Sequence, residues 1–180
     1  MIIQIYEIQT PEEAERCRAL GVDHIGSVLL ATREWRQPSI RNLIQQTRGS
    51  SSKNSLIPLF AAALEKTSDF FLTDTWLGRE PVEGYVGITG RPVDWDLAKK
   101  VVRQSRIPVI LAGGLSPENA YDAVVSVRPA GADSCTLTNA LDPAGKLIRF
   151  RKDFARVAAF VAEVRRAEAS LAKDSPPETR

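Results

Sequence analysis

The chain has 180 residues, 43% of them hydrophobic, which is enough for one folded domain with a sizeable core. Its 24 Lys and Arg residues nearly balance 22 Asp and Glu residues, and the formal charge of +2 disfavours nucleic acid as a partner. No apolar run reaches the roughly 20 residues of a membrane span, and residues 1–5 lack the apolar stretch of a signal peptide. We therefore expect a cytoplasmic protein that has no membrane partner.

Cysteine and histidine are scarce in this sequence. Cys17 and Cys135 form neither a disulfide framework nor a zinc-binding spacing, and His24 is the single histidine. We predict that the protein binds no metal and needs no cofactor.

The first half of the chain alternates short apolar runs with amphipathic stretches, which is typical of β–α units on a parallel sheet. Residues 2–6 are predicted to form a strand. Thr10 can cap a helix in which Pro11 fills the first turn and Glu13 lies three residues after the cap, and Gly21 can end it. The other elements expected here are a strand over 23–30, a helix over 38–47, a strand over 55–60 and a helix end at 64–68.

The second half repeats this alternation around one long loop. Residues 69–75 have the apolar density of a buried strand, and the Gly- and Pro-containing loop over 77–92 is long enough to suggest a function. We expect a single domain over 1–172 and a disordered tail over 173–180. Its remaining predicted elements are a helix capped by Asp94, a strand over 107–112, a helix opened by Ser116-Pro117-Glu118, a last strand over 131–137 and a C-terminal helix from about Phe154 to Val164.

One pattern occurs twice: residues 10–14 leading to Gly21-Val22-Asp23, and residues 116–120 leading to Gly131-Ala132-Asp133. Repeated βα units favour an α/β fold of the TIM-barrel type, and an open doubly wound sheet is the alternative. No Gly-x-Gly-x-x-Gly sequence follows a strand, so a dinucleotide-binding fold has no support.

In a barrel, ligand-binding groups lie at the C-terminal ends of the strands. Asp94 can be a helix cap, or a general acid or base beside the glycine-containing loop, and Asp74 at a buried strand end is either paired or poised in the site. Gly113-Gly114 forms either a tight turn or a phosphate site of bare backbone N–H groups. Further donors near it would come from Ser134, Thr136, Thr138 and Asn139, and Cys135 reads as a small buried hydrophobe.

Residues 88–95 (ITGRPVDW) and 108–119 (PVILAGGLSPEN) resemble phosphoribosylanthranilate isomerase, over about residues 69–165 and more weakly over 1–30. The resemblance implies a (β/α)8 barrel that performs an Amadori rearrangement on a phosphoribosyl-amine. It places Asp94 on the general acid. The same resemblance implies a phosphate site at Gly113, Gly114, Ser134, Cys135 and Thr136, and a substrate pocket that includes Tyr6, Gly90 and Arg91.

The sequence departs from the family at the end of the first strand. The family has a catalytic cysteine as base there, whereas this chain has Tyr6-Glu7. Tyrosine has an ordinary pKa near 10 and is a poor base at neutral pH, so Glu7 would have to swing inward to replace the cysteine. The glycine-rich loop also lacks the Gly-Gly pair of the family, and Cys135-Thr136-Leu137 replaces a Ser-Gly turn.

The chain is also short for a full barrel, because only about 13 residues separate Leu56 from Asp69 and six strands are recognised. Two alternatives are open. Either the barrel is shortened and a second copy of the chain covers the exposed strand edges as a homodimer, or an internal segment of the barrel is missing from this sequence.

Two hypotheses follow from these features. The first is an isomerase of a small phosphorylated sugar or sugar-amine, with Asp94 as acid and Glu7 or Asp74 as base. The second is a catalytically silent protein that binds a phosphorylated metabolite or serves assembly.

Overall fold

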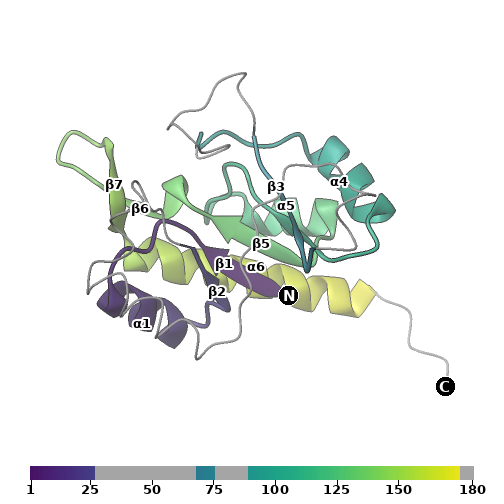
Figure 1. Ribbon diagram of the computed structural model, residues 1–180, viewed down its shortest axis with the longest axis horizontal. Coiled ribbons are helices and arrows are strands. Elements are labelled where there is room, and N and C mark those ends of the chain that lie inside the picture. The colour runs from purple at the N-terminus through teal and green to yellow at the C-terminus, as the bar shows by residue number, and fades with distance from the viewer. Residues whose placement is uncertain (27–67, 76–88, 175–180) are drawn as a thin grey trace.

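The computed structural model describes residues 1–26, 68–75 and 89–174. Its centre is a parallel sheet with helices packed against it, and a small antiparallel hairpin projects at one end (Figure 1). The sheet contains β1 (Ile2–Ile5), β2 (His24–Ile25), β3 (Phe71–Thr73), β4 (Val109–Leu111) and β5 (Gly131–Ser134). The helices are α1 (Pro11–Ala19), α4 (Trp95–Gln104), α5 (Ala120–Val127) and α6 (Phe154–Asp174), and the hairpin is β6 (Asn139–Leu141) with β7 (Leu147–Lys152).

The strand order β2-β1-β5-β4-β3 places the first strand beside the last. Strands β1 and β5 run parallel, with Ile2 opposite Gly131 and Ile5 opposite Ser134. Read from β3 through β4, β5 and β1 to β2, the order follows the chain once its two ends are joined, and this is how a closed barrel arranges its strands. The predicted alternation of β and α units therefore holds for the described residues, which form an arc of a barrel.

The two faces of the sheet carry different side chains because successive residues of a strand point to opposite sides. Ile3, Ile5 and Leu111 face the helices and join the largest hydrophobic cluster, with residues of α1, α5 and α6. On the inner face, Leu72, Ile110 and Ala112 form a smaller cluster against Ile2 and Phe70. His24 packs edge-on against Phe70 with 5.8 Å between ring centroids.

The start of α1 confirms the predicted capping pattern. The hydroxyl of Thr10 accepts a hydrogen bond from the backbone N–H of Glu13 at 3.2 Å, and the Glu13 carboxylate accepts one from the backbone N–H of Gln9 at 3.0 Å. The first bond satisfies a donor that a helix N-terminus leaves without an intrahelical partner, and the second ties the residue before the cap to the first turn.

Several predicted boundaries were wrong. The strands expected over 69–75 and 107–112 are shorter, at Phe71–Thr73 and Val109–Leu111. The last strand of the sheet ends at Ser134 instead of 137, because Thr136–Thr138 turns into a short 3-10 helix, η2. Helix α5 begins at Ala120 rather than at Ser116, because a turn built on Asn119 and Ser116 comes first. Helix α6 runs to Asp174, two residues past the expected end of the domain. The hairpin was not predicted. The elements expected over 38–47 and 55–60 lie outside the described residues, and so does the helix end expected over 64–68 except for its last residue.

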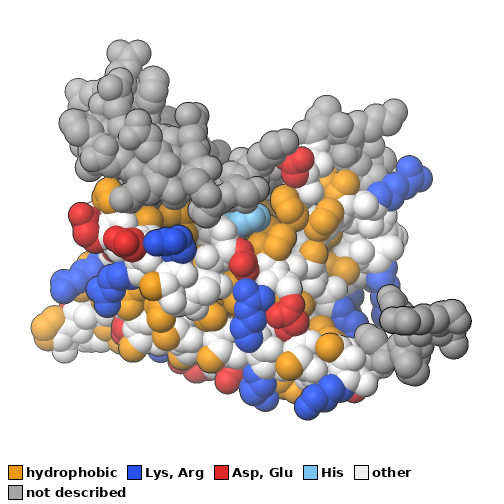
Figure 2. Space-filling model, turned by 90° about the horizontal axis from the view of Figure 1, so that it is seen from below, with side chains coloured by type: hydrophobic (Ala, Val, Ile, Leu, Met, Phe, Trp, Pro, Cys, Tyr) orange, Lys and Arg blue, Asp and Glu red, His pale blue; other side chains and the backbone are white. Residues whose placement is uncertain are grey.

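The described surface shows no single-sign patch on the face drawn in Figure 2, where basic and acidic side chains are interspersed. None of the helices in the described ranges combines the length and the hydropathy of a membrane-spanning segment.

Candidate active site

A cleft lies at the C-terminal ends of β3, β4 and β5, where a barrel fold is expected to bind ligands. Four segments of the chain meet there: the end of β3, residues 89–90, the glycine turn after β4, and the end of β5 with the turn that follows it. The cleft is lined by Asp74, Thr89, Gly90, Gly113, Gly114, Leu115, Asp133, Cys135, Thr136 and Leu137.

The glycine turn forms one wall of the cleft and needs its glycines. Gly113 and Gly114 have φ angles of +98° and +62°, which favour glycine. A Cβ atom at Gly114 would lie 2.5 Å from the backbone carbon of Arg91, so the turn packs directly on the 91–92 backbone. Within the described part of the chain, the N–H groups of Gly113 and Gly114 make no hydrogen bond. Bare N–H groups in a cleft suit an anionic ligand.

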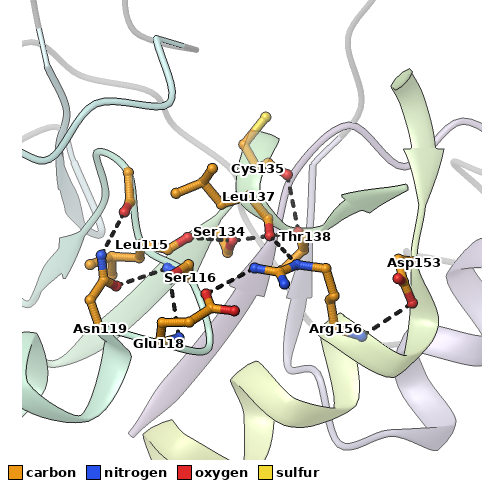
Figure 3. A network of polar contacts seen from close by, with 11 residues as sticks. Leu115, Ser116, Glu118, Asn119, Ser134, Cys135, Leu137, Thr138, Asp153 and Arg156 are labelled. Carbon is orange, nitrogen blue, oxygen red and sulfur yellow. Dashed lines mark hydrogen bonds and ion pairs between the residues drawn. The ribbon is translucent and has the colours of Figure 1, made fainter. Parts of the chain in front are cut away.

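The turn after β5 forms the facing wall, and its N–H groups at Thr136 and Leu137 also lack a partner among the described residues. Side chains behind it hold this turn in place, as Figure 3 shows: the Thr138 hydroxyl donates to the Cys135 carbonyl at 3.0 Å. The Ser134 hydroxyl donates to the Leu115 carbonyl at 2.7 Å and ties the two walls together. Ser134 is buried and does not line the cleft, so it supports the predicted phosphate site from behind.

Two carboxyl groups lie in the cleft. Asp133 is almost fully buried, and its Oδ1 atom has no hydrogen-bond partner among the described residues. Burial, together with the nearby negative charge of Asp74, raises the pKa of Asp133 to about 7. Asp74 is half-buried, and its Oδ1 accepts a hydrogen bond from the backbone N–H of Thr75 at 2.7 Å. A pair of neighbouring carboxyl groups in which one holds its proton near pH 7 is suited to acid–base chemistry.

Asp94, which the resemblance placed on the general acid, lies elsewhere. Its side chain is exposed and does not line the cleft. Its Oδ1 accepts hydrogen bonds from the backbone N–H groups of Asp96 and Leu97 at 2.9 and 3.0 Å, so Asp94 is the N-cap of α4. Of the neighbouring pocket candidates, Gly90 lines the cleft, whereas Arg91 is exposed and contributes its carbonyl to the Thr75 hydroxyl at 2.8 Å.

Glu7 does not reach the cleft either. It has a φ angle of +65° and is fully buried, where the Arg149 guanidinium binds its Oε1 at 2.6 Å and the Asn139 amide donates to Oε2 at 2.8 Å. Burial alone would raise its pKa, but these hydrogen bonds and the charges of Arg149 and Lys152 hold the pKa of Glu7 below its usual value. Tyr6, its neighbour, lies outside the cleft lining and packs its ring so closely on Gly26 that a Cβ there would be 2.0 Å away.

Sequence reasoning missed Asp133 as a site residue. From the sequence, Asp133 was considered only as part of a repeated pattern. The signal that could have found it is its spacing: a carboxylate two residues after Gly131 in a buried strand lies on the same face of the sheet as that glycine. Cys135, in contrast, lines the cleft but is not activated, because burial raises the pKa of its thiol.

Comparison with known proteins places this geometry in context. The family model for N-(5'phosphoribosyl)anthranilate (PRA) isomerase matches residues 37–136. N-(5'-phosphoribosyl)anthranilate isomerase 1 of Methanosarcina mazei is 30% identical over 135 residues, which are 74% of this chain and 54% of the relative. The chain spans about half the length of the curated relatives it matches.

Solved structures also resemble this chain. The crystal structure of TrpF from Jonesia denitrificans has a TM-score of 0.57 at 18% identity, covering 93% of this chain and 98% of that one. A phosphoribosyl anthranilate isomerase in complex with reduced 1-(o-carboxyphenylamino)-1-deoxyribulose 5-phosphate has a TM-score of 0.57 at 16% identity, covering 92% and 99%. This likeness confirms the predicted α/β fold of the TIM-barrel type, in shortened form.

Proposed function

The chain belongs to the N-(5'phosphoribosyl)anthranilate (PRA) isomerase family, and from this premise we propose that its cleft binds a phosphorylated sugar-amine and isomerises it by acid–base catalysis. The observation that carries the proposal is the carboxyl pair of Asp74 and Asp133 between two walls of unpartnered N–H groups. The walls would hold the phosphate and the pair would move the protons.

The carboxyl pair supplies both proton transfers that such an isomerisation needs. In a ribosylamine, the protonated carboxyl would give its proton to the ring oxygen, so that the ring C–O bond breaks and the nitrogen lone pair forms a C=N bond. The ionised carboxylate would then take the proton from the adjacent carbon, leaving an enol-amine that tautomerises to the amino-ketose. Atoms and charge balance, because one proton is given and one is taken. The raised pKa of Asp133 makes it the partner that holds the proton at rest.

This assignment replaces Asp94 and Glu7 with Asp133 and Asp74. The Asp94 oxygen is used by a helix N-terminus, and the Glu7 carboxylate is neutralised by Arg149 outside the cleft. A lowered pKa also makes Glu7 a weaker base. No residue of the first strand therefore replaces the catalytic cysteine of the family. We assign both proton transfers to the carboxyl groups at β3 and β5.

The experiment measures turnover of N-(5'-phosphoribosyl)anthranilate by the purified chain and by two matched variants. We expect Asp74→Asn to lower kcat by about 100-fold or more, the usual contribution of a general acid or base. Asp94→Asn is the control: asparagine caps helices as well as aspartate, so α4 and turnover should stay intact. Equal losses in both variants would contradict the assignment.

A catalytically silent phosphate-binding protein is the second candidate, favoured by one observation: Tyr6 and the ion-paired Glu7 occupy the end of β1. Thermal stability measured with inorganic phosphate, ribose 5-phosphate and the reduced deoxyribulose phosphate analogue separates the two. A ligand at 100 times its Kd adds about 2.7 kcal/mol to stability. Stabilisation without turnover of the phosphoribosyl-amine would favour the binding protein, and no stabilisation by any of the three would rule out the phosphate site.

A further inference from the structure

The turn after β5 has two carbonyl groups that point to cations outside the cleft. The Lys152 ammonium donates to the Cys135 carbonyl at 2.8 Å, and the Arg156 guanidinium donates to the Leu137 carbonyl at 2.8 Å, a bond drawn in Figure 3. Cys135 and Leu137 line the cleft, whereas neither cation does. The two cations therefore hold the two ends of one cleft wall from behind.

Peptide planarity links the Lys152 contact to an N–H group of the cleft, whereas the Leu137 carbonyl held by Arg156 shares its peptide unit with the Thr138 N–H, which donates back to the Cys135 carbonyl and closes the turn. A trans peptide unit directs its carbonyl and the following N–H to opposite sides. When Lys152 holds the Cys135 carbonyl on its own side, the N–H of Thr136 must point away from Lys152. This is one of the N–H groups that lack a partner among the described residues.

Lys152 is an unusual residue for a purely structural contact. Only 6% of its surface is exposed, and its ammonium also donates to the Asn139 side chain at 2.6 Å. Removing an ammonium from water is costly, and an apolar side chain of similar volume is often as good or better for stability. Arg156 has a second anchor as well, because it pairs with Glu118 at 2.9 Å and so connects the turn to the segment before α5.

We propose that Lys152 and Arg156 are positioning residues that fix the 135–137 turn so that its N–H groups can bind a phosphate monoester. The inference rests on the proposed function for the class of ligand only. The C-terminal segment, which follows the barrel strands, would then control the affinity for phosphate.

The test compares phosphate affinity across paired variants by isothermal titration with ribose 5-phosphate. Lys152→Met and Arg156→Met should each weaken binding about tenfold or more. The first removes the charged donor of the Cys135 carbonyl, which keeps only its contacts with Thr138, and the second removes the Arg156 donor of the Leu137 carbonyl. Arg156→Lys keeps a cation and should restore part of the affinity. Two controls remove a charge close by but leave the donors of the turn in place. Arg149→Met breaks the Glu7 pair and the contact of Arg149 with the Phe150 ring, and Glu118→Gln weakens the contacts of Glu118 with Arg156 and Ser116. Both should bind within about twofold of the parent chain.

A second measurement separates this inference from the proposed function. The amide chemical shifts and exchange rates of Thr136 and Leu137 report the turn itself, without any ligand. Changed amide signals in Lys152→Met and Arg156→Met, but not in Arg149→Met, would support positioning. Unchanged amide signals, or unchanged affinity in both methionine variants, would overturn it. If the parent chain binds no sugar phosphate but the amide signals change, the proposed phosphate site fails and the positioning role stands.

Discussion

Two buried carboxyl groups lie on neighbouring strands of the sheet and have opposite surroundings. Glu7 follows β1 and meets Arg149, Asn139 and the nearby charge of Lys152, so its pKa falls. Asp133 lies in β5 opposite Gln4, has Asp74 as a charged neighbour and keeps one oxygen without a partner, so its pKa rises to about 7. Burial is common to both. The contacts with Asn139 and Arg149 make Glu7 a structural anion. At Asp133 the Gln4 hydrogen bond and the charge of Lys152 do not offset burial and the charge of Asp74, so this carboxyl group can exchange a proton near neutral pH.

The largest expected effect is on stability at high pH. The folded chain holds the Asp133 proton up to about pH 7, whereas the unfolded chain releases it near pH 4, so stability should fall as pH rises between these values and level off above. The difference corresponds to about 4 kcal/mol at most. Asp133→Asn should remove this slope and unfold at higher urea concentration at pH 8 than the parent chain. The parent chain should therefore lose more stability between pH 5 and pH 8 than Asp133→Asn does, because all other titrating groups are the same in both. Equal losses would contradict the raised pKa of Asp133.

Turnover should show the same contrast. Asp133→Asn removes the exchangeable proton and should lower kcat by about 100-fold or more, and the kcat of the parent chain should decline above about pH 7. Glu7→Gln lies outside the cleft and should change kcat far less. Steady-state assays from pH 5.5 to 8.5 would check both, and a larger loss in Glu7→Gln would return the base to the end of β1.

The ion pair between Arg149 and Glu7 is expected to make a measurable contribution to the free energy of unfolding. Arg149→Met leaves a buried carboxylate with one cation fewer and should lower the free energy of unfolding by about 1–3 kcal/mol, less than for a fully buried pair because Arg149 is partly exposed. The double variant Glu7→Gln with Arg149→Met should recover part of this loss in urea titrations. For Glu7 the sign with pH is also reversed: its lowered pKa adds stability that is lost as pH falls below about 4.5.

The smallest effect is expected at Glu118, whose carboxylate pairs with Arg156 in solvent. Hydrogen bonds from Ser116 and Arg156 lower the pKa of Glu118 to about 2, but the side chain is largely exposed. Glu118→Gln should change the urea midpoint by well under 1 kcal/mol of stability. A loss comparable to that of Arg149→Met would mean that solvent exposure does not distinguish the two ion pairs.

The repeated sequence pattern shows how far local information reaches. Asp23 and Asp133 close the same motif, and the motif correctly indicated two βα units. Asp23, at the entrance to β2, binds the Ile3 N–H at 2.8 Å and the Arg165 guanidinium at 3.1 Å, whereas Asp133 is inside the barrel. The sequence is alike at both positions, but the charged partner of Asp23, Arg165, comes from 142 positions further along the chain.

Much of the architecture followed from the sequence alone, because it depends on local patterns: the alternation of strands and helices, the Thr10 cap, the glycine turn after β4 and the barrel type. Several candidate site residues from the sequence line one cleft, namely Asp74, Gly90, Gly113, Gly114, Cys135 and Thr136. The Asp94 cap is local and was also predicted from the sequence. What only the tertiary structure decided is the chemical state of Glu7 and Asp133, which are both carboxyl groups at or near strand ends. Only the fold brings a hairpin with Arg149 to Glu7 and a second carboxylate to Asp133, and the pKa of each is set by such neighbours and by burial rather than by sequence position.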